Sequence, residues 1–397
     1  MHNNLLRIEK ILNIDFTHAR GAHKLVRYPE EHQHKSLQAW DAVDEYIISY
    51  VQNNHAPLLE SITQAQRVGI FNDDFGALTC AFNQFNPVHI SDSHVSQLGC
   101  RNNLFKNELD VDSVEFVAST DQLHFQFDVV LMQLPKNLAL LEYQLHQIRQ
   151  CVHSDTIIIA GGKLTAVTKN VQQLFNQIVG PCHTSLAVKK ARLVIGSYDA
   201  ELTPPEHNEW NSWEITKPDL TLSHLPNVFS RLHLDIGARF LMQHLPPVGG
   251  EHVVDLGCGN GVIGCSVLAE APNARITFVD ESYMAVASAK RNVQDNFPEQ
   301  FSQCDFVVAN GLKNVDISHV DLVLCNPPFH QQHAVTDHIA WQMFKDAKFV
   351  LRHGGELRII GNRHLPYGNM LQKRFGGFSV IATNAKFSIL STYKNAK

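Results

Sequence analysis

The tetrapeptide Asn326-Pro327-Pro328-Phe329 combines residue types that suit chemistry on an exocyclic amino group. Such an amine is a poor nucleophile when it is conjugated to a purine ring, so an enzyme has to orient it. The Asn326 side-chain oxygen and the Pro327 carbonyl are two acceptors that can hold the two amino hydrogens. Proline stiffens the turn, and Phe329 offers a face for stacking of an extruded base. We therefore expect catalytic roles for Asn326, Pro327 and Phe329, although the tetrapeptide alone could also be a plain turn.

A second candidate feature is the glycine-rich segment from Asp255 to Gly261, which follows the apolar run His252 to Leu256. Glycine is needed where the backbone turns sharply or approaches a ligand closely. Alone, the segment could serve a nicotinamide, a flavin or S-adenosylmethionine, or be a tight turn. The downstream Asn-Pro-Pro-Phe favours S-adenosylmethionine. The expected cofactor contacts here are Asp255, Gly257, Gly259 and Gly261.

Two further polar residues end predicted strands. Asp280 follows Ile276 to Val279, where a carboxylate can accept both hydroxyls of a ribose. Asn310 follows Phe306 to Ala309, where an amide could bond the adenine amino group. A helix N-cap is the alternative for Asp280, and a turn residue is the alternative for Asn310. We expect both in the cofactor site, together with Asn326.

The segments around these residues alternate short apolar runs with amphipathic stretches, which is typical of a parallel sheet covered by helices. The pattern predicts an α/β, Rossmann-like fold, with an antiparallel hairpin at the sheet edge. The predicted strands are His252–Leu256, Arg275–Val279, Phe306–Ala309, Asp321–Cys325, Glu356–Ile360, Phe378–Ala382 and Phe387–Thr392; the predicted helices include Ser282–Asp295 and Ile339–Leu351.

The N-terminal half resembles a degenerate copy of the C-terminal half. Val68 to Gly76 has the shape of a strand and glycine turn, Phe127 to Lys136 parallels Val320 to Phe329, and Thr156 to Lys163 parallels Glu356 to Arg363. Three segments in the same order indicate duplication. Gln133 stands for Asn326 and Lys136 for Phe329, so the copy keeps the core pattern and loses the chemistry. A polar linker near Pro205 predicts domains at 1–205 and 206–397.

Composition places the 397 residues among globular proteins, with 44% hydrophobic and 18% charged residues. The N-terminus lacks an apolar leader and no stretch is long enough to span a membrane, so we expect a cytoplasmic protein. The eight cysteines lack C-x-x-C spacing, and His330 and His333 have no third partner at a recurring spacing. We therefore expect no metal and no disulfide framework, and we expect a monomer.

The net charge of −6 gives no general sign of nucleic-acid binding. Residues 1–205 carry 16 basic and 21 acidic residues, and residues 206–397 carry 17 and 18. Local basic clusters remain, and a solvated face is the alternative for each of them. The residues that we expect to contact substrate are Pro328, Phe329, His330, Arg363, Lys189, Lys190 and Arg192.

With these motifs, the C-terminal half resembles class I S-adenosylmethionine-dependent methyltransferases. Its Asn-Pro-Pro-Phe tetrapeptide resembles the motif of the branch that methylates amino groups. Over nearly its full length the chain resembles bacterial ribosomal RNA guanine-N2 methyltransferases, in which a degenerate methyltransferase domain precedes an active one. The segment from Asn326 to His333 is similar to the large-subunit enzymes of this family. The resemblance implies N2-methylation of a guanine in 23S rRNA that carries little protein, with an N-terminal domain that holds RNA. It also implies that Phe229, Ser230, Asp235 and Gly237 form the outer wall of the cofactor site.

Other substrates present the same amino group. The tetrapeptide alone is compatible with a guanine of 16S rRNA, an adenine of DNA or RNA, or a protein glutamine amide. A different class, a non-catalytic RNA-binding protein that keeps the cofactor as a structural ligand, is disfavoured by the intact Asn326 and Phe329.

Overall fold

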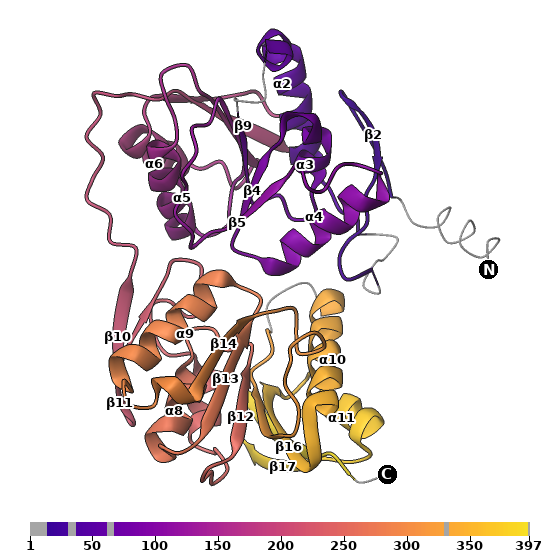
Figure 1. Ribbon diagram of the computed structural model, residues 1–397, viewed down its shortest axis with the longest axis vertical. Coiled ribbons are helices and arrows are strands. Elements are labelled where there is room, and N and C mark those ends of the chain that lie inside the picture. Colours follow the sequence, from indigo (N-terminus) through magenta and orange to yellow (C-terminus); the bar gives the residue numbers. More distant parts are fainter. Residues whose placement is uncertain (1–13, 31–36, 62–66, 329–332, 396–397) are drawn as a thin grey trace, which may run out of the picture. The chain divides into compact units, whose positions relative to one another are not determined.

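The computed structural model describes residues 14–30, 37–61, 67–328 and 333–395 (Figure 1). The chain divides into two compact units, residues 1–208 and 209–397. The division lies in the same polar segment in which the sequence suggests a linker. No helix within the described ranges is long and apolar enough to cross a membrane.

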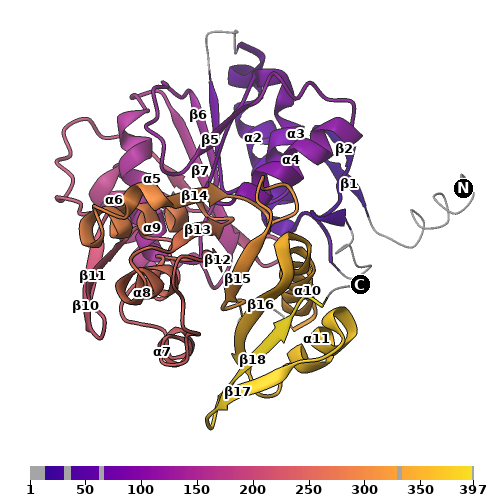
Figure 2. The same cartoon turned by 60° about the horizontal axis from the view of Figure 1, so that its bottom comes forward.

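The second unit is built on a seven-stranded sheet (Figure 2). Its strand order is β14-β13-β12-β15-β16-β18-β17, with β16, β18 and β17 joined antiparallel and the other pairs parallel. The first parallel strands thus place their carboxyl ends at one edge. The strands are β12 (His252–Leu256), β13 (Arg275–Asp280), β14 (Cys304–Val308), β15 (Val320–Cys325), β16 (Leu351–Asn362), β17 (Ser379–Thr383) and β18 (Phe387–Tyr393).

Helices cover both faces of this sheet, which is why its central strands are apolar on both sides. One core joins β12 and β15 to α7 and α8, and the other joins β15 and β16 to α10 and α11. A separate hairpin packs on α9. These elements are α7 (Ile236–Met242), α8 (Val262–Glu270), α9 (Tyr283–Asn296), α10 (His333–Val350), α11 (Tyr367–Phe375), β10 (Asn211–Thr216) and β11 (Asp219–His224).

The Rossmann-like prediction is confirmed, including the antiparallel edge hairpin of β17 and β18. The predicted third strand, Phe306–Ala309, was wrong at its start, because Cys304 already pairs with Ile276. The helix predicted from Ile339 begins earlier, at His333. The β10–β11 hairpin and α7 were not predicted, because they are short and their polar and apolar residues show no extended periodicity.

The first unit has a seven-stranded sheet in the same succession, β5-β4-β3-β6-β7-β9-β8. Read from the second sheet, β3 takes the place of β12, β6 that of β15 and β7 that of β16. These are the three segments from which duplication was predicted. The strands are β3 (Val68–Phe71), β4 (Val88–Ser91), β5 (Glu115–Ala118), β6 (Val129–Gln133), β7 (Ile157–Lys163), β8 (Cys182–Thr184) and β9 (Ala191–Gly196).

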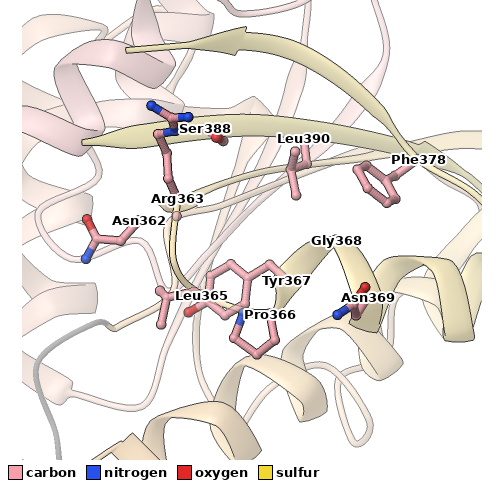
Figure 3. A pocket seen from close by; sticks show the side chains of 11 residues that line it. Asn362, Arg363, Leu365, Pro366, Tyr367, Gly368, Asn369, Phe378, Ser388 and Leu390 are labelled. Atoms are coloured by element: carbon pink, nitrogen blue, oxygen red, sulfur yellow. The ribbon is translucent and has the colours of Figure 1, made fainter. Parts of the chain in front are cut away.

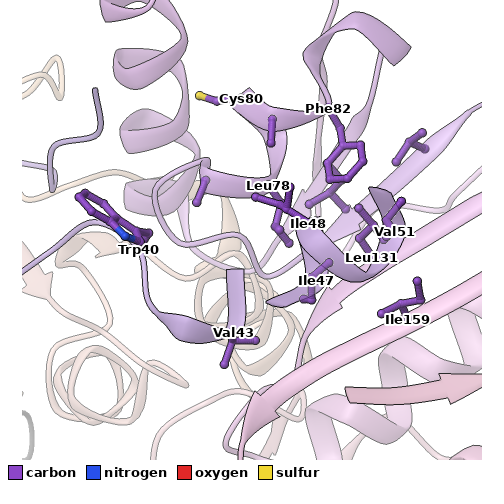
Figure 4. Close-up of a cluster of buried hydrophobic side chains, with 14 of the residues drawn as sticks. Trp40, Val43, Ile47, Ile48, Val51, Leu78, Cys80, Phe82, Leu131 and Ile159 are labelled. Atoms are coloured by element: carbon purple, nitrogen blue, oxygen red, sulfur yellow. The ribbon is translucent and has the colours of Figure 1, made fainter. Parts of the chain in front are cut away.

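Helix α2 (Ala42–Ser61) packs on β7 and β9 of this sheet. Its residues Val43, Ile47 and Val51 pack with Leu131 and Ile159 in one hydrophobic core (Figure 4). The other helices are α3 (Ala77–Ala81), α4 (His94–Lys106), α5 (Leu138–Gln150) and α6 (Lys169–Ile178), and a small hairpin is formed by β1 (Asp15–His18) and β2 (Gly21–Lys24). The copy therefore keeps a complete core of its own.

Candidate active site

The turn between β12 and α8 depends on its glycines. Gly257, Gly259 and Gly261 have φ values of 73°, 54° and 79°, a region that side chains disfavour. A Cβ at Gly261 would lie 2.9 Å from Cβ of Ala289, so this glycine allows α9 to pack closely. A Cβ at Gly259 would meet nothing within 4 Å. The loop thus leaves open space on the side where a ligand can approach its backbone.

Asp280 ends β13 beside this loop. Its Oδ2 accepts the Gly259 N–H at 2.9 Å, and its Oδ1 accepts the Ser282 N–H at 3.0 Å. Ser282, not Asp280, is the side-chain N-cap of α9. Asp280 therefore holds the glycine loop at the strand end where ribose hydroxyls were predicted, and its contact with a ligand stays a prediction.

Asp255 lies fully buried beneath the loop. Its Oδ2 accepts the Gly264 N–H at 2.9 Å, and its Oδ1 has no hydrogen-bond partner within the described chain. Burial raises the pKa of Asp255 to about 7, and the nearby Asp280 carboxylate adds to the rise while the Gly264 N–H opposes it. Asp255 therefore ties the loop to the first turn of α8, and a direct cofactor contact stays a prediction.

This buried carboxyl makes stability depend on pH. An unfolded aspartic acid ionises near pH 3.8, whereas folded Asp255 ionises near pH 7. Between these values the folded state holds one proton more than the unfolded state, so stability falls as pH rises from about 4 to about 7 and levels off above that. Asp255→Asn keeps an acceptor for Gly264 and cannot ionise. The difference in urea midpoint between this variant and the wild type should grow from pH 5 to pH 8; a difference that does not change would contradict the shifted pKa.

Asn310 follows β14 at the same edge, where the Ala309 N–H donates to the Asp280 carbonyl at 2.9 Å. Phe229 is 54% exposed and Ser230 has a φ of 57° in the segment before α7. An exposed aromatic ring and a left-handed residue suit a wall that a ligand would cover. The cofactor roles of all three residues stay predictions.

Asn326 follows β15 and faces the start of α7. Its Nδ2 donates to Asp235 Oδ2 over 3.4 Å, and this same oxygen accepts the Ala238 N–H at 2.8 Å as the N-cap of α7. Because the amide nitrogen donates to a carboxylate, the amide oxygen points away from Asp235 and has to find a hydrogen-bond donor elsewhere. Asn326 Oδ1 is buried and has no hydrogen-bond partner in the part of the chain that the structure describes.

The space in front of this acceptor is kept open by Gly237. A Cβ there would lie 2.9 Å from Asp235 Oδ2 and 3.7 Å from Asn326 Oδ1. Pro327 is buried and Pro328 is exposed. The predictions for Phe329 and His330 lie outside the described residues. The structure thus brings Asn326, Asp235 and Gly237 together beside the glycine loop.

A cavity of about 230 Å³ opens where β16 meets α11 (Figure 3). Asn362 and the predicted substrate residue Arg363 line it, with Tyr367 and Phe378 as apolar walls. Arg363 is exposed. Asn362 was not predicted as a site residue, although its place at the end of the Glu356–Ile360 strand could have indicated it.

In the first unit, the strand ends that correspond to this site carry different chemistry. Gln133, at the end of β6, donates from Nε2 to Asp44 in the first turn of α2. This pair repeats the Asn326–Asp235 arrangement between a strand end and a helix start. At the end of β4, Ser91 Oγ accepts the Ser93 N–H at 3.1 Å, as Asp280 does for Ser282. The carboxylate that could hold ribose is therefore a serine in the copy.

The glycine loop is also filled in the first unit. Asn72 and Gly76 keep positive φ values of 60° and 83°, but Asp73, Asp74 and Phe75 stand between them. Burial raises the pKa of Asp73 and of Asp74. Two carboxyls, of which Asp73 is buried, and an aromatic ring take the place of the open glycine turn, which gives the loss of chemistry a structural reason.

The basic residues of the first unit that were predicted to contact substrate lie on β9 or directly before it. Lys163 pairs with Ala191 across β7 and β9, and the Leu164 N–H donates to the Lys190 carbonyl at 2.8 Å. Lys189 is bonded to Glu45 at 2.6 Å, which offsets its charge. Arg192 lies on β9. Substrate contact by Lys189, Lys190 and Arg192 stays a prediction.

Three possible metal ligands meet in the described part of the first unit. Ligand atoms of Glu142, His146 and His207 lie within 4.8 Å of one another. The two imidazole rings are stacked, with centroids 4.5 Å apart and planes 13° from parallel. The lone pair of an imidazole nitrogen lies in the ring plane, so parallel rings do not direct two nitrogens at one ion. This geometry favours a stacked histidine pair over a coordinated ion.

Comparison with known proteins covers both units. Residues 13–200 match the family model described as RLMG N-terminal domain, and residues 219–391 match the Methyltransferase small domain. Together with the sheet order, the glycine turn and the strand-end Asn-Pro-Pro, these matches define a class I methyltransferase. The protein is an enzyme of two Rossmann-like domains, the first of them degenerate.

Relatives named ribosomal RNA large subunit methyltransferase G cover nearly the whole chain. The protein of Pseudoalteromonas atlantica is 46% identical over 381 residues, which are 94% of this chain and 97% of its own. That of Pectobacterium atrosepticum is 48% identical over 370 residues, 93% of this chain and 96% of its own. This chain belongs to the ribosomal RNA large subunit methyltransferase G family, which confirms the resemblance to large-subunit enzymes found in its sequence.

A solved structure shares the fold of both units. The 16S rRNA N2 G1207 methyltransferase (RsmC) of T. thermophilus, solved with AdoMet and guanosine, has a TM-score of 0.72 and 18% identity. The match covers 96% of this chain and 97% of that one. At this identity the likeness shows the two-domain architecture.

Proposed function

We propose that this enzyme uses S-adenosylmethionine to methylate the exocyclic N2 amino group of a guanine in 23S rRNA that carries little or no bound protein. The observation that carries the proposal is the buried, unused Oδ1 of Asn326 at the end of β15. Asp235 orients the amide so that its oxygen can accept a hydrogen bond from a ligand, and an amino group is a suitable donor.

The cofactor site fits S-adenosylmethionine on three grounds. The open side of Gly259 lets a ligand approach the loop backbone, the Asp280 carboxylate stands at the strand end for ribose hydroxyls, and Asn310 lies at the next strand end. When bound, S-adenosylmethionine supplies an electrophilic methyl group. The likeness to a structure solved with AdoMet supports this choice of cofactor.

The chain's own residues orient the nucleophile. Asn326 Oδ1 and the Pro327 carbonyl accept the two amino hydrogens, so that the nitrogen lone pair turns out of the base plane toward the methyl donor. The buried Pro327 keeps this pair of acceptors rigid. Positioning and exclusion of water, rather than a strong base, then supply the rate enhancement, since the amino proton can leave to solvent after methyl transfer.

The ribosomal target rests on the relatives. They are named for the large-subunit RNA, whereas the 16S rRNA enzyme shares the fold at only 18% identity. We therefore favour 23S over 16S rRNA as the substrate. An RNA-holding role of the first unit, through Lys163, Lys190 and Arg192, belongs to the same proposal.

The substrate can be tested with tritiated S-adenosylmethionine and four acceptors: protein-free 23S rRNA, protein-free 16S rRNA, DNA and a release factor. We expect label in 23S rRNA only, and N2-methylguanine after digestion. Assembled large subunits are the matched control and should accept much less label. Label in 16S rRNA alone would overturn the assignment to the large subunit, and label in DNA or protein alone would overturn the RNA assignment.

A further inference from the structure

A second buried acceptor lies beside Asn326. Asn362 ends β16, and its Oδ1 is buried without a hydrogen-bond partner among the residues that the structure describes. A strand-end amide with a desolvated oxygen costs free energy unless a ligand or water satisfies it. This acceptor is not used by the cofactor site as proposed above.

The two amides lie on the same face of the sheet. Side chains alternate along a strand, and Leu322 and Leu324 of β15 pack in the α7–α8 core, so Asn326 continues that face. Ile360 of β16 packs in the same core, so Asn362 continues it as well. Figure 3 shows the Asn362 amide directed away from Leu390 and Phe378, which belong to the other side of the cavity.

The register places the two amides within reach of one small ligand. Cys325 pairs with Ile359, so Asn362 lies one strand across from Asn326 and two residues further along. At strand spacings of about 4.8 Å and 3.3 Å per residue, their Cα atoms are roughly 8 Å apart. Phe387 lies between the two amides. It pairs with Asn362 across β16 and β18, and its ring lies 3.5 Å from the position of a Cβ at Gly237, which is itself 3.7 Å from Asn326 Oδ1.

We propose that Asn362 forms a guanine-reading subsite together with Asn326, in which Asn362 Oδ1 accepts the N1–H of the target base. This proposal rests on the proposed function. In guanine the donor N1–H stands next to the N2 amino group, whereas in adenine the acceptor N1 stands next to the N6 amino group. Asn326 and Pro327 can accept hydrogen bonds from the amino group of either base, so they do not distinguish the two. With its amide oxygen toward the base, Asn362 bonds guanine and would face the lone pair of adenine, so this orientation of the amide selects guanine.

The discriminating substrate is 2-aminopurine, which keeps the 2-amino group of guanine and has an unprotonated N1. The full-length enzyme is assayed on an RNA fragment that carries guanine or 2-aminopurine at the methylated position. We expect the wild type to prefer guanine by about 100-fold in kcat/KM. Asn362→Leu, which removes the acceptor at similar volume, should lower kcat/KM for guanine by about 30-fold or more and leave that for 2-aminopurine within about three-fold.

Two further variants separate recognition from folding. Asn362→Asp keeps an acceptor oxygen and should retain a preference for guanine. Asn369→Ala changes an exposed amide that lines the same cavity and should leave both values unchanged. Equal losses on both bases for Asn362→Leu, or no loss on either, would overturn the subsite while leaving the proposed function standing. Absence of methyl transfer by the wild type to any RNA would overturn the proposed function and the subsite with it.

Discussion

Asn326→Ala is expected to lower kcat for methyl transfer about 1,000-fold, the size of effect seen when one positioned hydrogen-bonding group is removed from an active site. The variant removes the buried acceptor Oδ1 and leaves the glycine loop and Asp280 in place. Affinity for S-adenosylmethionine should therefore stay within about three-fold of the wild type. Single-turnover methylation and calorimetric cofactor titration measure the two quantities separately.

Two variants test whether orientation of the Asn326 amide is the cause. Asn326→Asp places a second carboxylate against Asp235, which should repel it and lose activity as well. Adding Asp235→Asn restores a donor–acceptor pair and keeps an N-cap for α7, so the double variant should recover at least about ten-fold. Wild-type turnover by Asn326→Ala would contradict the steering role altogether.

Asp280→Ala is expected to weaken binding of S-adenosylmethionine about 100-fold, or about 2.7 kcal/mol. The change removes the carboxylate proposed for ribose and also frees the Gly259 and Ser282 N–H groups that it holds. The dissociation constant from calorimetry measures the effect. Asp305→Ala, which removes an exposed carboxylate bonded to Arg275, is the matched control and should change affinity less than two-fold. Unaltered affinity in Asp280→Ala would exclude this residue from the cofactor site.

The effects of the two residues should separate. In the proposed roles, Asp280 acts on cofactor affinity from the end of β13, and Asn326 acts on turnover from the end of β15. Between them lies β12. Asn326→Ala leaves the hydrogen bond between Gly259 of the glycine turn and Asp280 in place, whereas Asp280→Ala removes it. A residue that merely stabilised the fold would move both readouts together, together with the unfolding midpoint.

Much of the second unit could be predicted because its signals are local. Apolar runs such as His252–Leu256 are strands since both faces of a parallel sheet are buried, and that strand was predicted with the bounds that the structure has. The glycines at 257, 259 and 261 need positive φ wherever the turn lies. The start of β14 was misplaced because Cys304 and Asp305 become strand residues only by pairing with β13.

The duplication shows the same limit more clearly. Sequence alone related three segments of the first unit to the second, and their strands prove to hold equivalent places in two sheets of one order. It did not reveal that Gln133 is bonded to Asp44, or that Ser91 stands for Asp280. Those relations join residues far apart in the chain, and only folding brings them together.

By itself the sequence determined that this protein has the turn and strand-end residues of an amino-methylating enzyme, because residue type, glycine spacing and apolar periodicity act over a few neighbouring positions. Tertiary structure alone decided which polar atoms are left unused. Asp235 turns the Asn326 amide from 91 residues away, and the register of β15 and β16 places Asn362 on the strand next to it. Hydrogen-bond partners are chosen by position in space, and position in space is the result of packing the whole chain.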